Sequence, residues 1–96
     1  MGLKITPFDP ADYLVSGDDA VDYLKIWMED GSAQEIARAI GDIARSRGMS
    51  EIAKSTGLGR QALYTALSEN GNPTLETLTA VLDALGLELT VKRKAA

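Results

Sequence analysis

The fold of this chain is decided by the stretch SEIAKSTGLGRQALYTALSENGNPT, which runs from Ser50 to Thr74. Apolar residues at helical spacing lie on either side of TGLG at residues 56–59, where glycine can adopt the positive φ of a tight turn. We therefore expect one helix at about residues 51–56, capped by Ser50, and a second at about 60–68. Two short helices that meet at a glycine-bearing turn form a helix-turn-helix.

The apolar residues around this turn fit the same arrangement. Ala53 lies four residues before Gly57, on the face where the two helices would approach most closely, and a larger side chain there would push them apart. Leu58 is expected to fill the corner, while Leu63 and Leu67 point from the second helix into the core. This combination favours a helix-turn-helix over a plain corner between two helices.

The remaining side chains of the second helix form a polar face, which is a candidate DNA-reading surface. In helix-turn-helix proteins the first residues of this helix enter the major groove and meet base edges. Gln61 can bond adenine through two atoms, and Arg60 can do the same with guanine. The alternative is an ordinary solvated polar face. The candidate DNA-binding residues on this helix are Gly59, Arg60, Gln61, Tyr64, Thr65 and Ser68.

A second candidate DNA contact lies at the start of the next helix, expected at residues 75–85. Thr74 is the expected N-cap, and the amide groups behind it would point at a backbone phosphate from the positive end of the helix dipole. Asn72 would add a side-chain donor, although ordinary turn chemistry accounts equally well for it. The spacing predicts a buried face made of Leu75, Leu78, Leu82 and Leu85.

Capping signals predict three further helices before this region. Asp9 and Pro10 are expected to open a short helix, and Asp18 to cap another at about residues 19–30. The apolar face of the second is expected to be Val21, Leu24, Trp27 and Met28. Ser32 and Glu35 form a capping box for a third helix that ends at Gly48. Its predicted buried stripe consists of Ile36, Ala37, Ile40, Ile43 and Ala44.

Residues 87–92, LELTVK, alternate strictly between apolar and polar, which predicts a short strand with Leu87, Leu89 and Val91 on one face. A single strand leaves its backbone groups unpaired and is not stable in water. We expect it to pair with its copy in a homodimer. The alternatives are a strand laid against a partner protein, and a helix tail that merely packs its three apolar residues.

A chain of 96 residues is expected to form one compact domain. We predict an all-α fold of five to six helices. An acidic helical extension at residues 1–31 precedes a DNA-binding helix-turn-helix region at 32–86, and a strand and tail follow at 87–96.

The acidic residues are concentrated in the N-terminal third. The net charge is −4 in total, and residues 1–31 hold two lysines against seven acidic residues, while 32–96 hold eight basic residues against seven acidic ones. Four of the five aromatic residues also lie in the first segment: Phe8, Tyr13, Tyr23 and Trp27. Aromatic anchors among carboxylates suit a basic protein partner. The alternative is that these rings cover a small core.

Composition argues against an enzyme. The chain has no cysteine and no histidine, which removes disulfides, thiolate metal sites and the usual general base. No glycine-rich phosphate loop is present, so we expect no catalytic residue, metal, cofactor or small-molecule substrate. No apolar run approaches the ~18 residues of a membrane span. We expect a cytoplasmic protein.

From Gly48 to Gly86 the sequence resembles the Cro/repressor-like, Xre-type helix-turn-helix class, which implies a lambda-repressor-like fold. Over about residues 8–91 it is similar to addiction-module antidote proteins, most clearly in GDIARSRGM, ALYTALSENGNPT and ALGL. This resemblance implies an antitoxin that binds its own operator DNA and represses its operon. It also implies a small basic toxin partner of the RelE/HigB type, which cleaves messenger RNA.

Two positions depart from the pattern that the resemblance implies. Similar proteins often have serine at the position of Gly59, and many Cro-like proteins have a phosphate-bonding glutamine at that of Glu51. A carboxylate at the second position would be repelled by phosphate, which leads us to consider weak DNA binding. Two other functions therefore stay open: a stand-alone phage-like repressor without a toxin partner, and a protein-binding module that no longer reads DNA.

Overall fold

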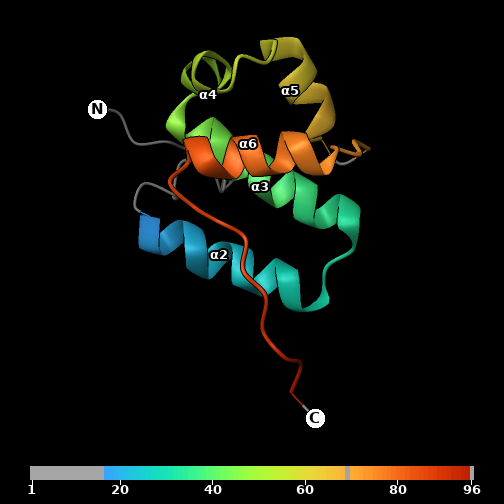
Figure 1. Ribbon diagram of the computed structural model, residues 1–96. Coiled ribbons are helices and arrows are strands. Elements are labelled where there is room, and N and C mark those ends of the chain that lie inside the picture. Colours follow the sequence, from blue (N-terminus) through green and yellow to red (C-terminus); the bar gives the residue numbers. More distant parts are fainter. Residues whose placement is uncertain (1–16, 69, 96) are drawn as a thin grey trace, which may run out of the picture.

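The computed structural model describes residues 17–68 and 70–95. The described chain forms five α-helices: α2 (Gly17–Asp30), α3 (Ala33–Arg47), α4 (Met49–Thr56), α5 (Arg60–Ala66) and α6 (Leu75–Ala84). Helix α3 contacts α2 and α4, and α4 in turn contacts α5 and α6 (Figure 1). Over the described residues the expectation of an all-α fold is confirmed, while the helix predicted from Asp9 lies outside them.

The ends of α3 are set by local chemistry that the sequence makes visible. The Ser32 backbone N–H donates to Glu35 Oε1 at 2.8 Å, and the Glu35 N–H donates to Ser32 Oγ at 3.1 Å. These two bonds are the predicted capping box. At the other end Gly48 adopts φ 101°, and Arg45 and Arg47 lie in the last turn beside the negative end of the helix.

The core is built by side chains from all five helices. Its largest fully buried side chains are Ile43 of α3, Leu63 of α5 and Val81 of α6. Each such burial stabilises the fold by about 1.5–3 kcal/mol relative to an exposed side chain. Because Leu63 belongs to the same cluster as Ile43, the core holds the short helix α5 against the long helix α3.

The turn between α4 and α5 takes the predicted form. Gly57 lies in the left-handed region at φ 76°, and its N–H donates to the Ala53 carbonyl at 2.9 Å. The Leu58 N–H donates to Thr56 Oγ1 at 3.2 Å, while the Leu58 side chain packs against the core. Gly59, extended at φ −69° and ψ 141°, is the N-cap of α5.

Several details of the predicted helices are wrong. Helix α2 begins at Gly17, so Asp18 lies inside it and is not its cap, and Val21 and Met28 of its predicted apolar face are exposed. Helix α4 begins at Met49, so Ser50 is not its cap: the N–H groups of Glu51 and Ile52 donate to the Gly48 carbonyl instead. Helix α5 ends at Ala66 rather than at residue 68. Leu75 is 68% exposed, although its spacing predicts a buried position, and Val81 is the fully buried residue of α6.

Residues 87–95 form neither helix nor strand, so the strand predicted for 87–92 is absent from this single chain. Gly86 at φ 76° turns the chain, and the Leu87 N–H donates to the Leu82 carbonyl at 2.8 Å, which closes α6. Beyond that point the segment runs past α2 with no neighbouring strand (Figure 1). A β-ladder needs a second strand to exchange hydrogen bonds with.

Two kinds of feature are absent from residues 17–68 and 70–95. No helix there is long and apolar enough to cross a membrane. Within the same residues no group of acidic side chains has the geometry of a metal site.

Candidate nucleic-acid interface

Helix α5 has one buried face and one exposed polar face. Leu63 is completely buried and Leu67 is nearly so, which fixes the rotation of the helix about its own axis. The side chains that this rotation turns outward are Arg60, Gln61, Tyr64 and Thr65. The structure therefore places these four predicted DNA-binding residues on one accessible surface.

A cation–π contact orders part of this surface. The Arg60 guanidinium carbon lies 5.6 Å from the centre of the Tyr64 ring, one helical turn away. Such a contact at an exposed site is worth about 0.5–1 kcal/mol. It leaves the guanidinium on the surface with its orientation restricted by the ring.

The other predicted contacts lie at the two ends of this surface. Ser68 Oγ donates to the Thr65 carbonyl at 2.8 Å, so its hydroxyl is tied to the last turn of the helix. Thr74 Oγ1 accepts from the Thr77 N–H at 3.1 Å, which confirms Thr74 as the cap of α6. Asn72 is exposed, and together with Thr74 and Ala62 it lines a hollow of about 200 Å³ beside α5.

The charges near α5 are mixed. Arg38 and Arg45 line a second hollow of about 200 Å³ between α3 and α5, which Tyr64 and Ser68 also border. The Arg45 guanidinium donates to Asp42 Oδ1, so part of this positive charge is neutralised within the protein. Glu51 lies exposed in the first turn of α4. The surface therefore carries arginine side chains that can bind phosphate, but it is not strongly basic.

The aromatic residues predicted to bind a partner have different surroundings. Phe8 and Tyr13 lie outside the described residues. Tyr23 and Trp27 are half-buried on α2, with their rings edge to face at 6.4 Å between centroids. Tyr23 Oη donates to Asp42 Oδ2 at 2.7 Å, so this side chain binds α2 to α3 of its own chain.

Sequence reasoning missed this polar connection. Asp42 is only 3% exposed, yet both carboxylate oxygens have partners: Tyr23 from α2 and Arg45 from one turn along α3. A buried carboxylate needs such partners to offset its loss of hydration. The available signal was Asp42 itself, an acidic residue between Gly41 and Ile43 and three residues before an arginine.

The hydrogen bond between Tyr23 and Asp42 predicts how the free energy of unfolding changes at alkaline pH. Burial raises the pKa of the Tyr23 phenol above its ordinary value, and the hydrogen bond and charge of Asp42 raise it further. The unfolded chain therefore loses this proton first, so the stability from Tyr23 is fully present below the unfolded pKa of ~10 and is lost as pH rises through the folded pKa.

Tyr23→Phe is expected to lower the free energy of unfolding by about 1 kcal/mol at neutral pH and to flatten its decline between about pH 9 and 11. Urea unfolding across this pH range measures both effects. Tyr64→Phe is the matched control, because that ring lies on the surface beside Arg60 and should leave the decline in place. An unchanged alkaline slope in the Tyr23 variant would contradict the role given to the phenol.

Comparison with known proteins gives the chain a family. The sequence profile of a family described as "Probable addiction module antidote protein" matches residues 4–93. A protein from Haemophilus influenzae (strain KW20 / Rd) carrying the description "Uncharacterized protein" is 40% identical over 93 residues, which cover 97% of this chain and 96% of that protein. No solved structure matches the sequence. The chain belongs to the family of probable addiction-module antidote proteins.

Proposed function

We propose that this protein is the antitoxin of a type II toxin–antitoxin module, and that it represses its own operon by binding operator DNA as a dimer. The family assignment supports the antitoxin role and a regulatory rather than enzymatic activity. The single observation that carries the DNA-binding part is the exposed face of α5, held outward by the buried Leu63 behind the tight turn at Gly57.

In this proposal α5 is the recognition helix of an Xre-type, lambda-repressor-like helix-turn-helix. Gln61 bonds an adenine, and Arg60, oriented by Tyr64, bonds a guanine through two N–H groups. The residues assigned to phosphates or to the methyl group of thymine are Gly59, Tyr64, Thr65, Ser68, Asn72 and Thr74.

Titration of a labelled duplex from the DNA upstream of the protein's own gene tests the DNA-binding part. Gln61→Ala is expected to weaken specific binding by about 1–3 kcal/mol and to relax the preference at one base pair, since its side chain is exposed and contributes nothing to the core. Fluorescence anisotropy with the operator and with a scrambled duplex gives both affinities. Affinity should also fall by ~0.9 log units per log unit of salt for each phosphate contacted.

The matched control is Gln34→Ala, which removes an equally exposed glutamine from the first turn of α3. It should leave both affinities unchanged. Equal binding of operator and scrambled DNA by the unaltered protein would contradict the repressor assignment. That result would favour the alternative of a protein-binding module, for which the exposed Glu51 and the net charge of −4 argue.

The toxin-binding part concerns a partner of opposite charge. We propose that a small basic toxin of the RelE/HigB type binds the acidic N-terminal third, with Phe8, Tyr13, Tyr23 and Trp27 as aromatic anchors. Support comes from the exposed carboxylates of α2, Asp22, Glu29 and Asp30, which lie on the same helix as Tyr23 and Trp27. Co-expression with the neighbouring open reading frame and a pull-down would test this. If the neighbouring gene does not encode a small basic protein, that result would favour the stand-alone repressor.

A further inference from the structure

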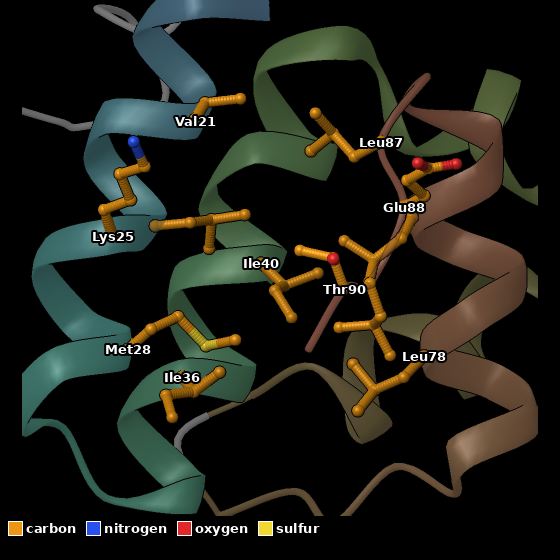
Figure 2. A pocket seen from close by; sticks show the side chains of 12 residues that line it. Val21, Lys25, Met28, Ile36, Ile40, Leu78, Leu87, Glu88 and Thr90 are labelled. Carbon is orange, nitrogen blue, oxygen red and sulfur yellow. The ribbon is translucent and has the colours of Figure 1, made fainter. Parts of the chain in front are cut away.

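An apolar groove crosses the side of the molecule away from the α4–α5 turn. Its volume is about 220 Å³, and its walls are α2, α3, α6 and the chain at residues 87–90. Figure 2 shows Met28, Ile36, Ile40 and Leu78 directed into this space from three different helices. Met28 is 52% exposed, so the groove is open to solvent. We call this space the tail groove, and residues 87–95 the tail.

The tail borders the groove without covering its own apolar residues. Leu87 is half-buried against the core, but Leu89 is 47% exposed and Val91 is 95% exposed. These three side chains alternate along the sequence, so an extended tail presents them on one face. Leu87 and Leu89 line the open groove, but Leu89 stays half exposed and Val91 lies outside the lining.

Opposite charges favour contact between the tail of one copy and helix α2 of another. The tail carries Lys92, Arg93 and Lys94, all exposed, directly after the apolar alternation. Helix α2 bears Asp22, Glu29 and Asp30 on its exposed surface outside the groove lining, against one exposed cation, Lys25, which lines the groove, so the helix is acidic in net charge. In a pair of copies, the tail of one chain and helix α2 of the other therefore carry opposite net charges as well as apolar side chains.

We propose that the tail of a second copy occupies the tail groove, with its Leu89 and Val91 against α2 and its basic residues over the acidic side of that helix. The exchange is reciprocal, because a two-fold axis gives each chain the other's tail. The two tails then run antiparallel and pair their backbones. This specifies the receiving surface of the dimer that the proposed function assumes, and it makes α2 part of the dimer interface.

The arrangement accounts for three features together. The incoming side chains fill the groove, the exposed Val91 loses its contact with water, and the backbone groups of 88–91 gain partners that a single strand lacks. It also explains why the alternation predicts a strand that the single chain does not form.

Sedimentation velocity of the full chain, without DNA or toxin, tests the dimer itself. The natural sequence should show a concentration-dependent dimer. Val91→Asp should raise the dissociation constant roughly a hundredfold, because each of the two symmetric sites loses a buried valine. The fold is not at risk, since this side chain is 95% exposed in the single chain. Leu75→Asp is the control: it replaces another exposed apolar residue, outside the groove, and should leave the dimer unchanged.

Disulfide cross-linking tests the receiving surface, because the chain has no cysteine of its own. Met28→Cys and Val91→Cys are introduced into separate chains, which are mixed and oxidised. We expect a cross-link between the two kinds of chain. A monomer at all concentrations, an undiminished dimer with Val91→Asp, or cross-links only between two Val91→Cys chains would each overturn the proposal. A monomer at all concentrations would also remove the dimer from the proposed function, whereas the other two outcomes would overturn only the site proposed here. Operator and toxin binding are measured separately, so their failure is distinguishable.

Discussion

Replacing Leu63 with alanine is expected to lower the free energy of unfolding by about 2–5 kcal/mol. The side chain is completely buried in the core cluster that all five helices share, so its removal leaves a cavity that the surrounding helices fill only in part. A domain of this size has a total stability of about 5–15 kcal/mol, so the loss is a large share of it. Urea unfolding followed by far-ultraviolet circular dichroism measures the change.

The control for this prediction is Leu75→Ala, which deletes the same atoms from a side chain that is 68% exposed. Its effect should stay within about 0.5 kcal/mol. The Leu63 variant should also lose DNA binding in parallel with folding, since Leu63 holds the proposed recognition helix to the core. Equal losses in the two variants would show that α5 is not anchored through Leu63.

Gly41→Ala is expected to destabilise the protein by about 1–3 kcal/mol, against the usual trend for helices. In the middle of a helix, alanine in place of glycine normally stabilises by about 0.5–1 kcal/mol. Here a Cβ atom at position 41 would lie 2.5 Å from the carbonyl oxygen of Leu67 and 3.1 Å from its Cβ. The end of α5 approaches α3 too closely for any side chain, so the sign of the change is the test.

A second substitution shows which atom causes the clash. Adding Leu67→Ala to Gly41→Ala should not restore stability, because the closest approach is to the backbone oxygen and remains after the side chain is shortened. A double-mutant cycle measured by urea unfolding gives the coupling between the two positions. A gain in stability from Gly41→Ala alone would mean that α3 and α5 lie farther apart than the structure shows.

Much of the local structure could be predicted because its causes lie within a few residues. The capping box at Ser32 and Glu35, the left-handed turn at Gly57 and the cap at Thr74 all depend on side chains close to the backbone groups that they satisfy. The prediction that Ser50 caps α4 is wrong for a related reason. The Gly48 carbonyl lies only two residues earlier in the chain, and it accepts the N–H groups of Glu51 and Ile52.

The outward face of α5 was also predictable, since Leu63 and Leu67 at helical spacing leave Arg60, Gln61 and Thr65 on the other side. The same reasoning failed for Leu75. Periodicity identifies an apolar stripe but not how far the neighbouring helices extend over it, and the first turn of α6 projects beyond the core.

By itself, the sequence determined the capping box at Ser32, the turn at Gly57, the cap at Thr74 and which face of α5 is polar, because dihedral preferences and capping bonds act over one or two turns. Only the tertiary structure decided that Tyr23 reaches Asp42 across 19 positions of sequence, and that α2, α3, α6 and the tail enclose a groove. Burial and partner choice arise from surfaces distant along the chain, which meet only when the helices pack. The alternating tail shows the same division: its pattern specifies a strand, but a strand forms only where another backbone lies beside it.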